Sequence, residues 1–377
     1  MSRALAITVA AFVTTCLLGA GEARAHPAWG IVVDRRGQVY FSDLETVWKI
    51  DAAGRLTVFR AGVPGRHVHE LALDTDGNLY GPDYSYVPER QTYLNAVWKM
   101  TPAGAFTYVL APTESMPRGM SIWRDRDGNT YAYEQNNNLK RETLLIRRTA
   151  GGAASVLAGG AYGHADGKGA RARFSSIVGM AFGAEGALYL ADGASVRRVT
   201  PDGTVSTLAD GLDVKGEGRN PVEGEVRWGG LMGLTVGARG EVYVADYRNR
   251  RVLKVTPGGA VSTAAQTEPP WAPTGVALAE GGDLYILEFG PTPSNANTPR
   301  VRRLSPDGRI VTVATVGQSE GTRESPPAVL PTAGAGTAGR AVSVRGASYL
   351  FYCVCAGAVA LTLVAFSLYR RSSGRTR

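Results

Sequence analysis

The sequence predicts an all-β fold, a six-bladed β-propeller over residues 26–315, and three observations support this prediction. A unit of four short strands recurs six times, its residues alternate between apolar and polar with the period of a strand, and tight-turn residues join its strands. Six four-stranded sheets with the same strand order are best closed in a ring. A β-sandwich or an open β-solenoid would also be all-β, but neither explains six long units of one plan.

The recurring unit is clearest between Leu188 and Ala209, in the stretch LYLADGASVRRVTPDGTVSTLA. Similar phrases start at Val242 (VYVADYRNRRVLKVTP) and at Asp283 (DLYILEFG). Each unit has a tyrosine in its second strand, and successive tyrosines are about 40 to 58 residues apart, a spacing suited to four strands with variable loops. The second-strand tyrosines are Tyr40, Tyr80, Tyr131, Tyr189, Tyr243 and Tyr285.

Glycine and proline occur where the strands of each unit reverse direction. DRRGQ, DTDGN and DRDGN join first and second strands, while TPAGA, TPDGT and TPGGA join third and fourth strands. The first strand of each unit is expected to be innermost, and its glycines, as in FSSIVGMAF and WGGLMGLTV, predict that the inner strands approach one another closely. Few residues precede Trp29, so the ring closes either by side-chain packing between the first and sixth blades or with help from residues after Thr315.

The segment from Gly163 to Ala209 closely resembles NHL-repeat propellers, whose phrase joins a DGxGxxARF lead-in to LYVAD, a basic third strand and TPDGxVSTLA. The fifth unit carries the fuller D-x-x-N-x-R version at Asp246, Asn249 and Arg251. The resemblance is strong over the fourth and fifth units and weak over the third. It implies the six-bladed fold and a place in the SMP-30/gluconolactonase-like superfamily, but it implies no reaction, because propellers of one shape host many functions.

Both ends of the chain carry targeting signals. Residues 1–25 have a basic start, an apolar run and an A-x-A site before His26, which predicts a secretory signal peptide. Residues 349–369 are uncharged and bordered by tyrosines, which predicts a transmembrane helix, and residues 370–377 form a basic cytoplasmic tail. Residues 316–348 read as a Pro/Ala/Gly-rich stalk. The sequence therefore predicts a single-pass protein of the cell membrane with its propeller outside the cytoplasm.

Charge and cysteine content narrow the partners of the propeller. Of the net charge of +8, residues 26–315 carry only +2, which argues against a nucleic-acid partner. The three cysteines, Cys16, Cys353 and Cys355, lie in the two predicted targeting segments. The propeller therefore contains no disulfide and depends on its core for stability.

The resemblance also implies where a metal would bind. SMP-30-like lactonases hold their metal with acidic or amide residues just ahead of the inner-strand glycine, and the corresponding residues here are Trp29, His69, Arg118, Val178, Met232 and Thr274. One histidine among apolar and cationic residues is a poor ligand set, so the sequence predicts no cofactor and favours a non-catalytic role. The alternative is a divalent metal at His67, His69 and Glu70, with Glu70 and His69 as catalytic groups. In RHVHEL, Glu70 replaces the glycine of the other five units.

Four long loops are expected at the mouth of the ring, at residues 84–96, 135–143, 210–230 and 289–299. The aromatic and charged side chains there predict a binding face made of Trp29, His69, Glu70, Tyr84, Tyr86, Tyr93, Arg118 and Trp228. The favoured function is a membrane-tethered scaffold that binds a protein, peptide or glycan. The alternative is a metal-dependent hydrolase or lyase of the SMP-30/gluconolactonase type, acting at the mouth.

An acid follows each second-strand tyrosine by three residues, at Asp43, Asp83, Glu134, Asp192, Asp246 and Glu288. Because the acid recurs in every unit, it predicts a structural task, the acceptance of backbone N–H groups where the second strand turns into the third.

Overall fold

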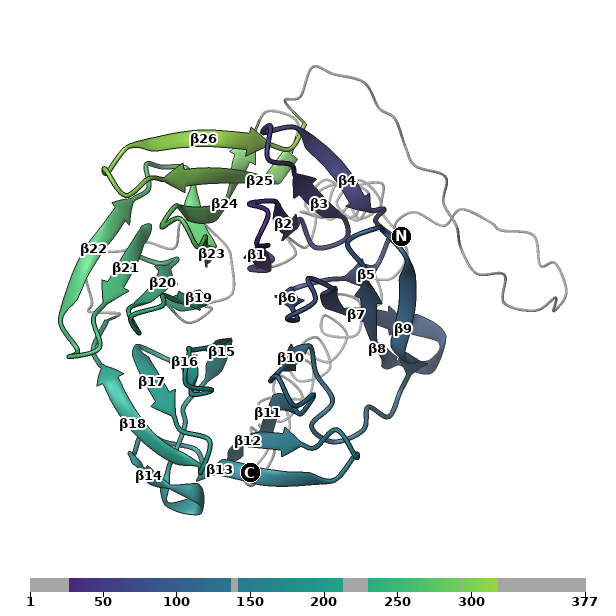
Figure 1. The fold of residues 1–377 in the computed structure, drawn as a ribbon. Helices are drawn as coiled ribbons and strands as arrows, with labels where there is room; N and C mark the ends of the chain where they lie inside the picture. The colour runs from purple at the N-terminus through teal and green to yellow at the C-terminus, as the bar shows by residue number, and fades with distance from the viewer. Residues whose placement is uncertain (1–26, 137–141, 213–229, 293–294, 318–377) are drawn as a thin grey trace, which may run out of the picture. The chain divides into compact units, whose positions relative to one another are not determined.

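The computed structural model describes residues 27–136, 142–212, 230–292 and 295–317. Its strands form six antiparallel sheets, one after another along the chain. Each sheet starts with its innermost strand, except that a short strand at the outer edge of the fourth sheet precedes the inner one. Figure 1 shows the sheets arranged as the blades of a propeller, so the predicted all-β six-bladed fold is confirmed. The predicted signal peptide, transmembrane helix and basic tail lie outside the described residues, as does the predicted stalk beyond residue 317. Within the described residues no helix has the length and apolar character needed to cross a membrane.

The first three blades occupy residues 31–161. Blade 1 contains β1 (Ile31–Val33), β2 (Val39–Ser42), β3 (Val47–Ile50) and β4 (Leu56–Arg60). Blade 2 contains β5 (Arg66–His67), β6 (Ala72–Leu73), β7 (Leu79–Val87), β8 (Thr92–Met100) and β9 (Phe106–Thr113). Blade 3 contains β10 (Trp123–Arg124), β11 (Thr130–Asn136), β12 (Glu142–Arg148) and β13 (Ala154–Ala161).

The last three blades extend to Thr315. Blade 4 contains β15 (Ile177–Phe182), β16 (Leu188–Asp192), β17 (Ser195–Val199) and β18 (Thr204–Ala209), and the short β14 (Gly167–Lys168) pairs with its outer edge. Blade 5 contains β19 (Leu231–Val236), β20 (Val242–Asp246), β21 (Arg251–Val255) and β22 (Val261–Gln266). Blade 6 contains β23 (Ala272–Leu278), β24 (Leu284–Thr292), β25 (Asn295–Leu304) and β26 (Ile310–Thr315). One-turn 3-10 helices lie at Pro88–Arg90 and Gly169–Arg171.

The predicted turns are confirmed by their hydrogen bonds. In the turn between β1 and β2, Asp34 Oδ1 accepts the backbone N–H groups of Arg36 and Gln38, each at 2.9 Å, and Gly37 has a φ of +74°. Asp74 and Asp125 repeat this arrangement in blades 2 and 3. The aspartate organises the turn, and the glycine adopts the left-handed backbone that other residues rarely reach.

Two of the predicted loops are largely strand. Residues 84–96 form the end of β7 and the start of β8, and residues 289–299 form much of β24 and β25, which pair through Glu288–Arg300 and Phe289–Pro299. The prediction of loops was wrong there because Tyr, Val and Thr at these positions favour an extended backbone, so the hairpins grow beyond the common blade. Most of the predicted loop at 210–230 lies outside the described residues.

The hydrophobic core consists mainly of clusters between neighbouring blades. Blades 1 and 6 share one, in which Phe41 and Ile31 pack with Leu287, Phe289 and Val301. The sheet of each of these two blades is built from its own four consecutive strands. The ring therefore closes by side-chain packing between these two blades. Val316, just after Thr315, also packs against this cluster, so the contribution expected from residues after Thr315 is observed as well.

Candidate functional site at the mouth of the ring

Glycines bring the inner strands of blades 4, 5, 6 and 1 into close contact. A Cβ atom on Gly179 would lie 2.5 Å from the Met232 carbonyl oxygen, and a Cβ on Gly275 would collide with the Trp29 carbonyl oxygen. A Cβ on Gly30 would lie 2.8 Å from the backbone of Glu70. The close approach expected from the sequence is thus observed, and only glycine fits at these positions.

Glu70 interrupts this pattern in blade 2. Both β5 and β6 pair with β7, so residues 68–71 lie between two short pieces of inner strand. The segment is held by blade 1, because the His69 carbonyl accepts the backbone N–H groups of Trp29 at 3.0 Å and Gly30 at 2.8 Å. The side chain of Glu70 extends to blade 3, where the Tyr133 hydroxyl donates a hydrogen bond to Glu70 Oε1 at 3.4 Å.

Aromatic rings surround this carboxyl group. The His69 ring stacks on Trp29 with centroids 5.5 Å apart, and it lies 5.6 Å from the Tyr84 ring. Glu70 and His69 are buried, whereas Trp29, Tyr84 and Tyr133 are partly exposed. We call the group Trp29, His69, Glu70, Tyr84 and Tyr133 the mouth cluster.

The mouth cluster is electrostatically unusual. Burial raises the pKa of Glu70 to about 8, and hydrogen bonds from Tyr133 and Trp29 offset only part of this effect. Burial and the nearby Glu70 raise the pKa values of Tyr84 and Tyr133 as well. At neutral pH the site therefore presents a protonated carboxyl group and two neutral phenols, which are hydrogen-bond donors beside aromatic faces.

Four other residues of the predicted binding face are not part of the mouth cluster, and three of them lie in the described residues. The rings of Tyr86 and Tyr93 face each other across the β7–β8 hairpin with centroids 5.0 Å apart, and they are 39% and 60% exposed. Arg118 forms an exposed ion pair with Glu134 at 3.2 Å. Trp228 lies outside the described residues.

Tyr133 was missed by the sequence analysis. The motif YAYE in blade 3 places Tyr131 and Tyr133 on the same side of β11, and this second tyrosine was the available signal. Nothing in the sequence around Tyr133 indicates that its hydroxyl reaches Glu70, 63 residues earlier in the chain.

The recurrent acids only partly follow the sequence prediction. Asp43 Oδ1 accepts the backbone N–H of Thr46 at 2.7 Å, and Asp246 Oδ1 accepts that of Asn249 at 3.3 Å, so these two contact backbone N–H groups of the turn that follows them. Asp192 instead accepts backbone N–H groups from Ser175 and Ser176, which precede its blade's inner strand.

Arginine is the more general partner of these acids. Five of the six form an ion pair with it: Asp83 with Arg60, Glu134 with Arg118, Asp192 with Arg197, Asp246 with Arg251, and Glu288 with Arg300 and Arg302. The sequence prediction considered only neighbours in the chain, whereas some of these arginines, such as Arg60, come from the preceding blade.

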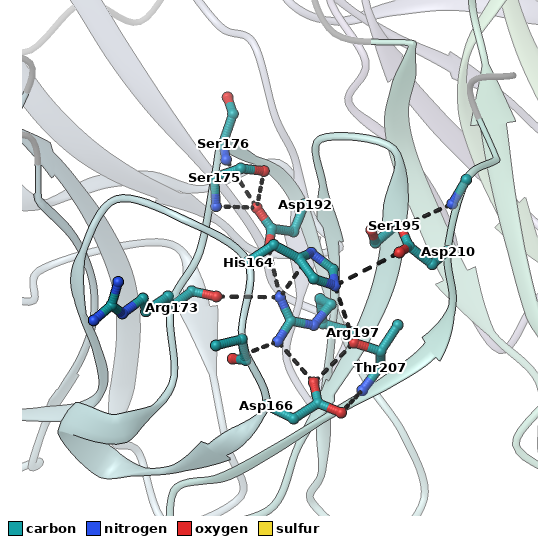
Figure 2. A network of polar contacts seen from close by, with 12 residues as sticks. His164, Asp166, Arg173, Ser175, Ser176, Asp192, Ser195, Arg197, Thr207 and Asp210 are labelled. Atoms are coloured by element: carbon teal, nitrogen blue, oxygen red, sulfur yellow. Dashed lines mark hydrogen bonds and ion pairs between the residues drawn. The ribbon is translucent and has the colours of Figure 1, made fainter. Parts of the chain in front are cut away.

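A network of polar contacts lies in blade 4 (Figure 2). The fully buried Arg197 donates to Asp192 and Asp166, at 2.9 Å in both cases, and to the carbonyl of Ala165 at 2.9 Å. Asp166 also accepts the backbone N–H of Thr207 at 3.0 Å. These contacts attach the lead-in segment of the repeat to the blade, which is a structural role.

A cavity of about 370 Å³ lies away from the mouth cluster, where the β1–β2 and β6–β7 turns meet. Its carboxylates Asp34 and Asp74 already accept the N–H groups of their own turns. The chemistry of the mouth cluster makes it the better candidate site.

The mouth does not fit a divalent metal. Across residues 27–136, 142–212, 230–292 and 295–317, no three or more His, Cys, Asp or Glu side chains come together as a metal-binding group. The alternative set of His67, His69 and Glu70 is therefore not assembled as three ligands; the His67 and His69 rings meet edge to face, with centroids 5.7 Å apart.

The chain is similar in sequence to a curated protein and in fold to solved structures. No family model matches the sequence. The chain is 27% identical over 281 residues to Teneurin-m of Drosophila melanogaster; the match covers 65% of this chain and 10% of that protein, so the chain spans about a tenth of the length of this curated relative.

Solved structures with a similar fold include three enzymes or binding proteins. A luciferin-regenerating enzyme matches with a TM-score of 0.50 and 15% identity, covering 75% of this chain and 92% of its own. Virginiamycin B lyase from Staphylococcus aureus matches with a TM-score of 0.43 and 18% identity, covering 77% of this chain and 85% of its own. Regucalcin, a calcium-binding protein from Agrobacterium tumefaciens, matches with a TM-score of 0.46 and 16% identity, covering 71% of this chain and 83% of its own. At such identities the likeness concerns the fold alone.

Proposed function

We propose that this protein is a non-catalytic binding propeller that recognises a protein, peptide or glycan through the mouth of its ring. The observation that supports this most is the mouth cluster, in which aromatic rings and hydrogen-bond donors gather beside the exposed Tyr86 and Tyr93. Tyrosine and tryptophan combine apolar contact area with a polar group, which is why binding surfaces are rich in them.

The proposal includes a membrane tether. Residues 349–369 anchor the chain, and the propeller faces the outside of the cytoplasm. Deleting residues 349–377 is expected to release the propeller from carbonate-washed membranes into the soluble fraction. Retention of the shortened chain in the membrane pellet would contradict the tether.

Peptide and glycan arrays test the binding function with the full-length protein. We expect a ligand whose signal falls at least tenfold in the Tyr86→Ala/Tyr93→Ala variant, because two exposed aromatic faces are lost. Tyr162→Ala is the matched control, since Tyr162 is a 52% exposed tyrosine that follows the outer strand of blade 3. An equal loss in the control, or no array ligand at all, would count against the mouth as a binding face.

A second candidate function is a hydrolase or lyase acting at the mouth. The observation that favours it is the raised pKa of Glu70, about 8, because carboxyl groups that remain protonated at neutral pH serve as proton donors in catalysis. In such a reaction Glu70 would protonate a leaving oxygen, with Tyr133 orienting its carboxyl group. No metal step is derived, since the described residues do not supply the ligands.

A panel of lactones and esters, followed by pH-stat titration, separates the two candidates. Turnover that is lost in Glu70→Gln and retained in Glu134→Gln would replace the binding proposal by the enzymatic one. Absence of turnover across the panel, together with array binding, favours the scaffold. Metal analysis of dialysed wild-type protein completes the test, because a stoichiometric ion lost in Glu70→Gln would restore the metal-dependent alternative.

A further inference from the structure

The buried acids of the described residues differ in whether an arginine forms an ion pair with them. Five acids are buried, namely Glu70, Asp83, Asp192, Asp246 and Glu288. Four of them hold an arginine: Asp83 contacts Arg60 at 2.7 Å, Asp192 contacts Arg197 at 2.9 Å, Asp246 contacts Arg251 at 2.8 Å, and Glu288 contacts Arg300 and Arg302. A buried carboxylate requires such a partner to remain ionised.

Glu70 has aromatic neighbours where the other four have arginine. Its contacts among the described residues are the Tyr133 hydroxyl and Trp29, and no lysine or arginine of these residues forms an ion pair with it. Glu70 is 7% exposed, and the ring of the adjacent His69 stacks on Trp29.

Ring faces and a buried carboxylate attract the same kind of ligand. The face of an aromatic ring carries negative charge density and attracts ammonium groups, and the attraction grows when water is excluded. A carboxylate adds a full negative charge and a hydrogen-bond acceptor for an N–H group. A metal ion would need several more oxygen or nitrogen ligands, which the mouth does not offer.

We infer that the mouth cluster binds an organic cation, an ammonium group on an apolar or aromatic stem, with the ammonium against the Glu70 carboxylate and the stem against Trp29 and Tyr84. This inference rests on the proposed binding function and specifies the chemistry of its ligand. The ammonium group takes the place that arginine occupies beside the other buried acids. Binding moves the Glu70 proton to solvent, while the ammonium keeps its own protons.

The release of the Glu70 proton on binding identifies Glu70 as the group that contacts the cation. The titratable groups that face Glu70 are Tyr133 from β11, Tyr84 from β7, and His69 and His67 from its own segment. Burial and the nearby Glu70 raise the pKa values of both tyrosines, so they stay neutral below pH 9. Ionisation of Glu70 favours cation binding as the pH rises, and a Glu70 variant removes this dependence.

Isothermal titration calorimetry of the full-length protein with phenethylammonium measures the association constant and the number of protons released. Measured at pH 7 in phosphate and in Tris, binding is expected to release close to one proton, because a carboxyl group with a pKa of about 8 is mostly protonated before the cation arrives. The association constant is expected to rise roughly tenfold from pH 6 to pH 7. The neutral isostere 2-phenylethanol is expected to bind at least tenfold more weakly.

Variants and a direct titration complete the design. Glu70→Gln keeps the shape of the side chain and is expected to lose at least tenfold in affinity together with the proton release. Glu185→Gln, on an exposed turn of blade 4, is expected to bind as the wild type does. The ¹³C carboxyl signal of Glu70 in the wild-type protein is expected to show a lower pKa when phenethylammonium is present, a result that does not depend on any variant folding.

Equal binding of phenethylammonium and 2-phenylethanol, or unchanged binding by Glu70→Gln, would overturn the inference. If phenethylammonium does not bind while an array ligand still depends on Tyr86 and Tyr93, the cation inference fails and the binding function stands. If neither probe nor array ligand binds, both fail.

Discussion

At the scale of single residues, Glu70 shows how one substitution changes the physics of a repeated position. The other blades carry glycine there, and the inner strands approach closely, whereas blade 2 carries a carboxyl group buried among Trp29, His69 and Tyr133. Without a cation beside it, this group holds its proton at neutral pH. Its ionisation therefore affects the stability of the folded chain.

The stability of the protein should depend on pH through Glu70. Its pKa in the folded chain is about 8, above the usual 4.5, so its contribution is fully present below pH 4.5 and is lost as the pH rises through 8. Each unit of pKa shift corresponds to about 1.4 kcal/mol. We expect the free energy of unfolding in urea to fall by a few kcal/mol more between pH 5 and pH 9 in the wild type than in Glu70→Gln. Parallel pH profiles of the two proteins would contradict this, and Glu185→Gln is the control that should follow the wild type.

Gly275 in blade 6 occupies the inner-strand position that Glu70 occupies in blade 2. A side chain there would collide with the Trp29 carbonyl oxygen, whereas a Cβ on Gly281, in the next turn of the same blade, would meet nothing within 4 Å. We expect Gly275→Ala to lower the free energy of unfolding by roughly 1–3 kcal/mol or more, and Gly281→Ala to change it by less than about 0.5 kcal/mol. Equal unfolding midpoints for the two variants would show that the inner strands are not in contact.

At the scale of elements, arginines of the third strands stabilise individual blades and connect them to neighbouring segments. Arg197 on β17 joins Asp192 of its own blade to the lead-in residues Ala165 and Asp166 (Figure 2). Arg302 on β25 contacts Glu288 in blade 6 and the carbonyl of Gln266 in blade 5. The basic third strand of the repeat is thus a structural device, because the planar guanidinium can contact several acceptors at once.

Arg197→Lys should be costly even though it conserves the charge. A lysine has a single nitrogen and cannot reach the acceptors on both sides, so buried acceptors lose their donor, and we expect a loss of roughly 3–5 kcal/mol. Arg198→Lys is the matched control, since the adjacent Arg198 is paired at 3.7 Å with the exposed Glu185, and we expect a change below about 1 kcal/mol. Chemical denaturation of both variants measures the difference; a similar loss in both would argue against the network.

At the scale of the whole ring, closure depends on side-chain packing, because the first and last blades each contain their own four strands. The cluster around Phe41 and Phe289 consists of buried apolar side chains from two blades, as does the cluster around Phe174 that joins blades 3 and 4. The joint between the ends of the propeller is therefore built like an internal joint.

Phe41→Ala and Phe174→Ala should have similar effects, because both rings are fully buried between blades. We expect each to lower the free energy of unfolding by about 3–5 kcal/mol and to leave a single cooperative transition. Hydrogen exchange should show faster exchange in blades 1 and 6 for Phe41→Ala. A midpoint unchanged by Phe41→Ala would mean that other contacts close the ring.

The sequence alone determined the six blades, their turns and the innermost position of the first strands. These features depend on local chemistry, such as period-two alternation, Asp and Gly in turns, and one tyrosine in each second strand. Glu70 was also identifiable as the one departure from glycine.

The tertiary structure decided what surrounds Glu70 and how the acids are paired. Tyr133 and Trp29 come from the two neighbouring blades, and Arg60 reaches Asp83 from the preceding blade. Such contacts depend on how blades meet in space, which no local pattern specifies. Burial sets the ionisation of a carboxyl group, and burial exists only once the ring has formed.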